Sequence, residues 1–387
     1  MAETGIFRSI FWLTFGAFAI GSEGLVIAGI LPVVGADLRV SVARAGQLVT
    51  AFSLAYAVTT PVLAVITAAR RREVVLRIAM GAFAAANVVA AAAPTFAWLM
   101  AARVLLAMGA GLFMATAGAY AASSAPPAKR GRAIALVYMG VTVATVVGVP
   151  LGTVLGDRFG WRATFVGVAI LAALACAGLC IPRTPHPAQP TASLSERVAV
   201  ARRPDVVMAL MTTMAFLAGQ FSIYTYLSPL LQRVSGLSNN QIACVLMLFG
   251  AGGAAGNLLG GYAADRFAPR HVVRSLLGAL VVLLTAISAV AAWVPAPAST
   301  ALLMVLVGAW GIVSWSFPPA QQVRLIQRVP HAVPVVLSLN SSAMYVGISL
   351  GAVFGSFAVA RERVEAVGLI GACCDVVALG LASWDTR

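Results

Sequence analysis

The stretch AIALVYMGVTVATVVGVPLGTVLGDRFGWRATFVGVAILAALACAGLCI at residues 133–181 contains two apolar runs, 133–155 and 162–181, joined by a short polar turn. An α-helix needs about 20 predominantly apolar residues to cross the hydrocarbon core of a bilayer, and each run reaches that length. The stretch therefore predicts two membrane-spanning helices connected by a tight turn.

The same alternation of long apolar runs and short polar connections fills the 387-residue chain. Its residues are 61% hydrophobic and 10% charged, with a mean hydropathy of +0.95. A soluble domain carries about 25% charged residues, so this chain lacks the polar surface that a soluble fold requires. We expect an all-α membrane protein with twelve transmembrane helices. The predicted spans are 9–34, 45–67, 74–93, 96–121, 133–155, 162–181, 205–231, 240–263, 273–293, 299–320, 334–359 and 366–384.

The distribution of the basic residues predicts the orientation of the chain in the membrane. Net charge is +14, from 26 Lys and Arg against 12 Asp and Glu, and most basic residues fall in alternate connections such as 70–77, 129–132, 183–203 and 266–274. Basic connections remain on the cytoplasmic side, so we expect both termini to be cytoplasmic. The positive charge then marks topology rather than binding to nucleic acid.

One long polar stretch divides the chain into two halves. PRTPHPAQPTASLSERVAVARRP at 182–204 is rich in Pro, Ser and Arg and predicts a cytoplasmic linker. It separates an amino-terminal six-helix bundle, 1–181, from a carboxy-terminal six-helix bundle, 205–387. Because both halves begin on the same side, we expect pseudo-symmetric parallel repeats about an axis normal to the membrane.

Small residues recur every four positions in four of the predicted spans. In lipid such stripes let helix backbones approach closely. We expect them to form two interfaces between the halves, the fifth span against the eighth and the second against the eleventh; static packing is the alternative reading. The stripes are Gly140, Ala144, Gly148, Gly152 and Gly156; Gly252, Gly256 and Gly260; Gly347, Gly351 and Gly355; and Ala51, Ala55 and Thr59.

Several of these stretches resemble the major facilitator superfamily, and together they extend over the whole chain. WLMAARVLLAMGAGLF at 98–113 resembles the Arg-and-glycine signature of helix 4, and GNLLGGYAADR at 256–266 resembles the second-half loop motif, with Asp265 and Arg266. PPAQQVRL at 318–325 and LNSSAMYVGISLG at 339–351 are similar to the chloramphenicol-resistance and arabinose-efflux-permease-like branch. The fifth span resembles the antiporter motif of twelve-helix drug:proton antiporters, carried by Gly140, Gly148, Pro150, Gly152 and Gly156.

The first-half loop departs from the superfamily pattern. Family members place an Asp before the arginines, where it helps to latch the cytoplasmic gate, but TAARRREVVL at 67–76 has Ala68 or Ala69 at that point. Either Glu73 substitutes for this acid or the latch is weak. Asp265 and Arg266 retain the gating motif in the second half.

Three ionisable residues are predicted well inside the membrane: Glu23, Arg103 and Asp375. A charge at the bilayer centre costs about 2.5–3.5 kcal/mol on insertion scales, so each needs a reason. Burial favours a neutral carboxyl whereas a nearby cation favours the charged form, so Glu23 can load and release a proton. Arg103 cannot lose its proton and would act as an electrostatic partner.

The resemblance strengthens this assignment. The branch commonly has an acid at the position of Glu23, and the family resemblance implies a proton-coupling role for Arg103. Purely structural roles, a hydrogen bond for Glu23 and a tie between helices for Arg103, are the alternatives. Asp375 falls in the twelfth span, which is peripheral in this superfamily, so we expect a structural carboxyl that stays neutral or bonds a neighbouring backbone group.

Aromatic and amide side chains on the spans that line the cavity of this fold are candidates for substrate contact. An aromatic cavity with a few amides suits neutral or lipophilic solutes, although each residue alone is more often a packing residue. Trp12, Trp98, Trp293 and Trp384 are expected to be interfacial anchors. The candidates are Tyr56, Tyr138, Gln220, Tyr224, Asn257, Trp310, Asn340 and Tyr345.

The chain carries no GKS or GKT phosphate-binding motif and no HExxH motif, and its five cysteines lack metal-ligand spacing. We expect no enzyme activity, cofactor or metal. The function expected is proton-coupled secondary active transport that exports small neutral or lipophilic molecules, as in drug efflux, by alternating access. Its partners are the substrate, protons and the lipid bilayer of a bacterial inner membrane, and the protein is expected to be monomeric. A sugar or nucleoside efflux permease is the alternative, and a non-transporting receptor or sensor the remote one.

Overall fold

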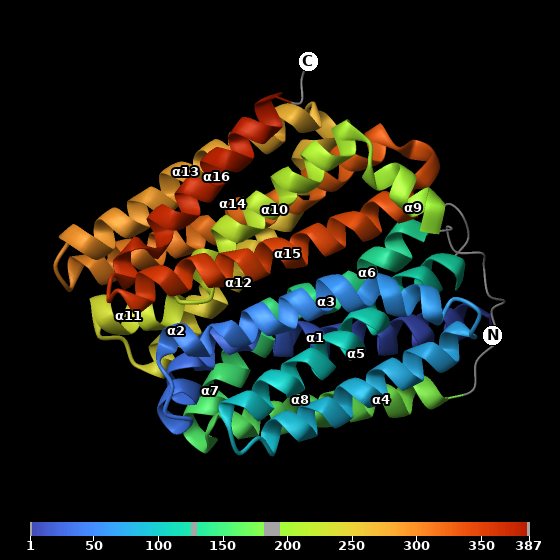
Figure 1. The fold of residues 1–387 in the computed structure, drawn as a ribbon, viewed down its shortest axis with the longest axis horizontal. Helices are drawn as coiled ribbons and strands as arrows, with labels where there is room; N and C mark the ends of the chain where they lie inside the picture. Colours follow the sequence, from blue (N-terminus) through green and yellow to red (C-terminus); the bar gives the residue numbers. More distant parts are fainter. Residues whose placement is uncertain (1, 125–129, 182–193, 385–387) are drawn as a thin grey trace.

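The computed structural model describes residues 2–124, 130–181 and 194–384, which form helices with no strand among them (Figure 1). Twelve helical segments in this part of the chain are long and apolar enough to cross a membrane. The expectation of an all-α protein with twelve spans is confirmed.

The first six spans come from the amino-terminal half. They are α1 (Ala2–Asp37), the pair α2 (Val42–Ala45) and α3 (Gln47–Ile66), α4 (Arg72–Ala91), α5 (Phe96–Ser124), the continuous run α6 (Arg130–Val143), η2 (Ala144–Gly148) and α7 (Val149–Phe159), and α8 (Trp161–Cys180). A short helix, α9 (Leu194–Ala201), follows within the predicted linker, of which residues 182–193 lie outside the described residues.

The last six spans come from the carboxy-terminal half, and Figure 1 shows the yellow-to-red helices grouped above the blue-to-green ones. The two groups meet chiefly along α12, which packs on η2 and α7, and along α15, which packs on α3. The helices are α10 (Pro204–Tyr224), α11 (Leu227–Ser235), α12 (Asn239–Arg266), α13 (Pro269–Trp293), α14 (Ala298–Arg328), η3 (Pro330–Ala332), α15 (Val333–Ala360), η4 (Val364–Ala366) and α16 (Val367–Trp384).

Prolines explain two departures from regular helices. Pro150 has no N–H to donate to the carbonyl of Val146, and the fifth span widens into a π-helical turn, η2, just before it. The seventh span, predicted as one helix over 205–231, ends at Tyr224 and restarts as α11 at Leu227. Pro229 then falls in the first turn of α11, where a missing N–H is tolerated.

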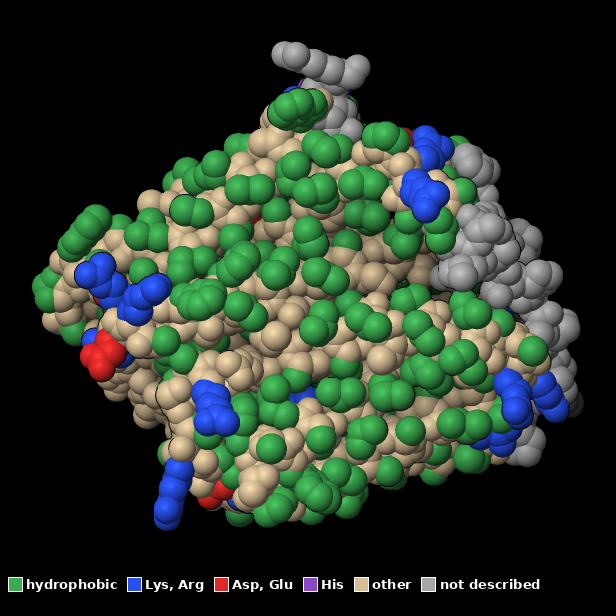
Figure 2. Space-filling model, viewed as in Figure 1, with side chains coloured by type: hydrophobic (Ala, Val, Ile, Leu, Met, Phe, Trp, Pro, Cys, Tyr) green, Lys and Arg blue, Asp and Glu red, His purple; other side chains and the backbone are tan. Residues whose placement is uncertain are grey.

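The surface matches a lipid environment. Figure 2 shows apolar side chains over the middle of the molecule and basic side chains towards its two ends. Trp98, Trp293 and Trp384 are largely exposed near helix ends, as expected for interfacial anchors. Trp12 differs, because its indole packs against Gly178 of α8.

The predicted pairing of spans is confirmed, but the role given to the glycine stripes was wrong. A methyl group at Gly148 or Gly156 would meet Ser22 or Ile30 of α1, not α12. The stripe of α12 faces the α14 backbone, since a methyl at Gly256 would collide with the carbonyl of Ile312. The α15 stripe similarly faces α10, and the ring and hydrogen-bond contacts of α3 with α15 come from Phe52, Tyr56 and Ala57.

These stripes therefore join helices within one half. A stripe of small residues shows that some backbone comes close, but not which helix supplies it. Closest packing is compatible with helices that keep their neighbours, whereas the halves of a transporter of this fold must separate and meet again.

Candidate functional site

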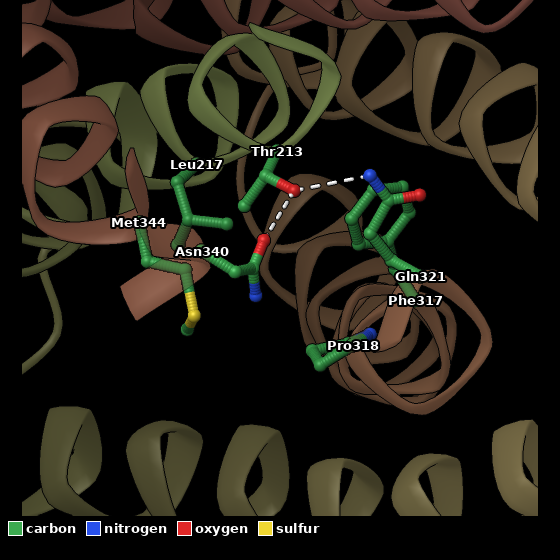
Figure 3. A pocket seen from close by; sticks show the side chains of 7 residues that line it. All are labelled: Thr213, Leu217, Phe317, Pro318, Gln321, Asn340 and Met344. Atoms are coloured by element: carbon green, nitrogen blue, oxygen red, sulfur yellow. Dashed lines mark hydrogen bonds between the residues drawn. The ribbon is translucent and has the colours of Figure 1, made fainter. Parts of the chain in front are cut away.

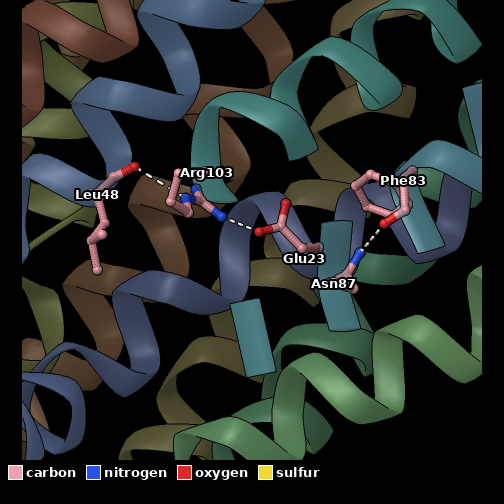
Figure 4. Close-up of polar contacts among 5 residues, drawn as sticks. All are labelled: Glu23, Leu48, Phe83, Asn87 and Arg103. Carbon is pink, nitrogen blue, oxygen red and sulfur yellow. Dashed lines mark hydrogen bonds and ion pairs between the residues drawn. The ribbon is translucent and has the colours of Figure 1, made fainter. Parts of the chain in front are cut away.

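Glu23 of α1 and Arg103 of α5 form an ion pair, and neither side chain has exposed surface (Figure 4). Arg103 donates from Nη1 to Oε1 of Glu23, and its Nε donates to the carbonyl of Leu48 on α3 at 3.1 Å. The guanidinium carbon also lies 4.4 Å from the centroid of the Phe52 ring. Arg103 thus connects three spans while it neutralises the carboxylate.

The ion pair is neutral as a unit, but its hydrogen bonding is incomplete. Within the described residues, Oε2 of Glu23 and Nη2 of Arg103 are buried without a hydrogen-bond partner. Of the flanking glycines, Gly21 packs closely on Val141 and Ala144, whereas a methyl group at Gly24 would meet only the Phe52 ring, at 3.9 Å. The expected room beside Glu23 is therefore on the Gly24 side.

A stacked tyrosine pair joins the two halves next to the ion pair. The rings of Tyr56 on α3 and Tyr345 on α15 lie 3.6 Å apart with an interplanar angle of 18°. Phe52, which contacts the Arg103 guanidinium, is 6.1 Å from Tyr56 and 6.4 Å from Tyr345, centroid to centroid. Two candidate substrate residues thus lie in one aromatic group beside the charged pair.

Three other candidates, Gln220, Tyr224 and Trp310, form a second buried group in the carboxy-terminal half. Nε1 of Trp310 donates to Oε1 of Gln220 at 2.6 Å, and Nε2 of Gln220 donates to both carboxyl oxygens of Asp375, at 3.0 and 3.2 Å. Asp375 therefore bonds a side chain of α10, and the expected bond to a neighbouring backbone group is replaced by this one. Tyr224 lies 6.4 Å from the Trp310 ring.

Asn340 belongs to a small pocket between α10, α14 and α15 (Figure 3). Thr213 donates its hydroxyl to Oδ1 of Asn340 at 2.8 Å, and Gln321 donates from Nε2 to Thr213 at 3.1 Å. The pocket offers hydroxyl and amide groups beside apolar walls. The residues that line it are Thr213, Leu217, Phe317, Pro318, Gln321, Asn340 and Met344.

Tyr138 and Asn257, the remaining substrate candidates, join neither buried group. Both side chains are exposed, Tyr138 on α6 and Asn257 on α12. In the motif of the fifth span, Gly140, Gly148, Gly152 and Gly156 all pack against side chains or backbone of α1. Pro150 is buried in α7.

The loop residues lie at helix ends. Arg266 ends α12 and donates to the hydroxyl of Tyr262 at 2.7 Å, and Asp265 beside it is exposed. Glu73 is buried in the first turn of α4, with Oε2 at 3.9 Å from Nε of Arg71. These positions leave the latch role of either loop as a prediction.

The sequence analysis missed Phe52, Thr213 and Gln321. Phe52 had a usable signal, because it precedes Tyr56 by one helical turn and residues four apart share a helix face. Thr213 and Gln321 are ordinary polar residues of two different spans, and only the packing of α10 on α14 and α15 brings them together. No group of His, Cys, Asp and Glu within the described residues is arranged to hold a metal ion.

Comparison with known proteins agrees with this architecture. The family model described as Major Facilitator Superfamily matches residues 12–372. The chain is 32% identical over 370 residues to the uncharacterized MFS-type transporter YbcL of Bacillus subtilis (strain 168), covering 96% of this chain and 93% of the relative. It is 33% identical over 345 residues to the inner membrane transport protein YdhP of Escherichia coli (strain K12), covering 89% and 86%.

Among solved structures, the D-xylose-proton symporter superposes with a TM-score of 0.79 at 18% identity, covering 98% of this chain and 97% of the other. This likeness extends the agreement to the fold. With a family match along almost its whole length and relatives that are transporters rather than enzymes, the chain belongs to the major facilitator superfamily.

Proposed function

We propose that this protein is a proton-coupled exporter of small neutral or lipophilic molecules that works by alternating access. The observation that carries the proposal is the buried Glu23–Arg103 pair. It places a titratable carboxyl and a permanent cation inside the membrane-spanning bundle, next to the aromatic group that joins the halves.

The chemistry of the pair supports a proton-coupling role. Arg103 keeps its charge, so only Glu23 can exchange a proton. In the described conformation Arg103 stabilises the carboxylate; protonation of Glu23 would remove this attraction and leave Arg103 without a counter-charge. Because an unpaired buried charge is costly, the protonated state favours a rearrangement that brings water or the opposite membrane face to the pair.

A proton moving down its gradient supplies enough energy for useful export. One elementary charge crossing 100 mV is worth about 2.3 kcal/mol, which corresponds to roughly a 50-fold substrate gradient per proton. Export against this gradient requires that proton binding and substrate binding exclude or follow one another at adjacent positions. Phe52 contacts both the guanidinium and the tyrosine pair and would transmit the change.

The aromatic group favours lipophilic substrates. Tyr56, Tyr345 and Phe52 offer ring faces for stacking, a mode that suits flat or apolar solutes. Efflux of a sugar or nucleoside is the second candidate, and the pocket at Thr213, Gln321 and Asn340 is the observation that favours it, because its hydroxyl and amide groups can bind solute hydroxyls. In this second candidate the tyrosines would be closing elements.

We further propose that the protein lies in the bacterial inner membrane with both termini cytoplasmic, as a monomer of two six-helix bundles, 1–181 and 205–387, joined by the linker 182–204. Basic connections at 70–77 and 266–274 support this orientation. The gating loop at Asp265 and Arg266 would then lie on the cytoplasmic side.

Proton flux in proteoliposomes tests the proposal. A chloramphenicol-like drug, a sugar and a nucleoside would each be added to the wild-type protein and to Glu23→Gln, with Glu362→Gln as the matched control at an exposed carboxyl. We expect drug-triggered proton movement in the wild type and the control, and its loss in Glu23→Gln. Substrate flux that ignores both the pH gradient and the substitution would show a facilitator, and binding without flux would support a receptor.

A further inference from the structure

The described structure holds two fully buried carboxyls, and their surroundings differ. Glu23 faces a cation, whereas Asp375 of α16, also without exposed surface, has the amide of Gln220 as its hydrogen-bonding partner and no ion pair within the described residues. A carboxylate in an apolar interior needs a cation or several donors to remain charged. One amide group does not provide this.

No basic group of the surrounding helices reaches Asp375. Arg274 of α13 donates to the carbonyl of Ser383, and Arg324 of α14 to that of Ala382, both at the far end of α16. The ionisable side chains that remain are Tyr224 of α10, Tyr345 of α15, Glu365 of η4 near the start of α16, and the neighbouring thiols Cys373 and Cys374. None of these carries a positive charge.

The carboxyl is nevertheless held in a defined place. Gly219 and Gly371 allow α10 and α16 to approach so closely that a methyl group at Gly219 would lie 2.8 Å from the carbonyl of Gly371 and 3.1 Å from Oδ1 of Asp375. Ser222, one turn further along α10, donates to the carbonyl of Val367 at 3.2 Å. This close contact sets Gln220 between Asp375 and Trp310.

Gln220 makes the chain sensitive to the charge of Asp375. Its Nε2 donates to the carboxyl while its Oε1 accepts from Trp310 at 2.6 Å, so one amide group transmits polarisation from one bond to the other. Trp310 packs on Phe249 at 4.5 Å, and Phe249 on Tyr224 at 5.3 Å. The hydroxyl of Tyr224 donates at 3.5 Å to the carbonyl of Leu25 in α1, two residues from Glu23.

We propose that Asp375 is a second proton-binding site, which holds its proton in the conformation described here and whose ionisation is reported through Gln220 to Trp310 and the contact between the halves. Loss of the proton turns the carboxyl into a pure acceptor, strengthens the Gln220 bond and draws the Trp310 indole onto Gln220. Proton binding relaxes the chain. The site does not depend on Glu23 being the coupling residue.

The test uses the full-length protein in liposomes without substrate or gradient, so its outcome is independent of transport. Infrared difference spectra between acid and alkaline pH would follow protonated carboxyl bands, and tryptophan fluorescence would follow Trp310. We expect one carboxyl band to vanish in Asp375→Asn, which keeps an acceptor for Gln220 but cannot titrate, and another to vanish in Glu23→Gln.

The pH-dependent fluorescence change should persist in Glu23→Gln and in Trp315→Phe, a matched control on the same helix, and disappear in Asp375→Asn and Trp310→Phe. Should Asp375→Asn fail to fold, ¹³C-labelled aspartate in the wild type must shift a protonated carboxyl band at neutral pH, because the aspartates other than Asp375 within the described residues, Asp37, Asp157, Asp205 and Asp265, all have exposed surface. A spectrum without such an aspartate band, or a fluorescence change unaffected by Asp375→Asn, would overturn the proposal.

Discussion

Arg103 stabilises the interior only together with Glu23. The two charges compensate each other without exposed surface, and removal of one partner leaves the other uncompensated. We therefore expect Arg103→Met to lower the free energy of unfolding by about 3–5 kcal/mol, and Glu23→Gln with Arg103→Met to recover part of that loss. Denaturant unfolding in detergent measures both.

Arg266→Met is the matched control for this prediction. Arg266 also contacts an aromatic ring, that of Tyr262, but at the exposed end of α12. Its replacement should change stability by less than about 1 kcal/mol. Equal losses for Arg103→Met and Arg266→Met would show that the buried pair contributes nothing special.

Tyr345 distinguishes the two substrate candidates. If a lipophilic substrate stacks on its ring, Tyr345→Phe should change the apparent affinity less than about twofold, while Tyr345→Ala should weaken it roughly tenfold, equivalent to about 1.4 kcal/mol. If a sugar or nucleoside binds through the hydroxyl, both variants should weaken binding equally. Concentration dependence of transport in proteoliposomes measures the difference.

The close packing of α12 on α14 determines how these helices tolerate side chains. A methyl group at Gly256 would collide with the Ile312 carbonyl, whereas at Gly261, five residues along the same helix, nothing lies within 4 Å. We expect Gly256→Ala to destabilise the protein by about 1–3 kcal/mol through overpacking. Gly261→Ala should be neutral or slightly stabilising, since alanine favours helix.

Thermal unfolding of the two variants in the same detergent tests this expectation. A neutral Gly256→Ala would mean that α12 and α14 can separate at little cost, and the small-residue stripe would then be a sliding surface rather than a fixed contact. The glycine pattern itself could be read from the sequence. Its partner could not, because the spacing of small residues is the same whichever helix packs on it.

For the whole molecule, the described conformation brings the halves together at the end that holds the connection between α7 and α8. There Nδ2 of Asn239 donates to Oδ1 of Asp157 at 2.5 Å, and Gly46 lies directly against the Tyr226 ring. Alternating access requires these contacts to open. In a chain whose five native cysteines are replaced, Asp157→Cys with Asn239→Cys should form a cross-link that abolishes transport.

Reduction of the cross-link should restore transport, and each single cysteine variant should transport normally. Gel mobility and substrate flux, measured on the same sample before and after reduction, give the result. Full transport by the cross-linked protein would show that the halves do not separate at this end, contrary to the alternating-access proposal.

The sequence by itself determined the class of the fold and the ionisable centre. Twelve apolar runs must become helices, because a backbone in lipid has to satisfy its own hydrogen bonds, and Glu23 and Arg103 were identifiable because charges in such runs are costly. Even the pairing of the fifth span with the eighth and of the second with the eleventh could be predicted.

Only the tertiary structure decided which side chains meet. Asp375 was expected to be a bland carboxyl, yet α10 and α16 approach at Gly219 and place it on Gln220. Phe52 came to lie between Arg103 and the tyrosine pair because α3, α5 and α15 converge there. Helical periodicity gives the face of a residue, but in lipid nearly every face is apolar, so the choice of partner depends on close packing of the whole bundle.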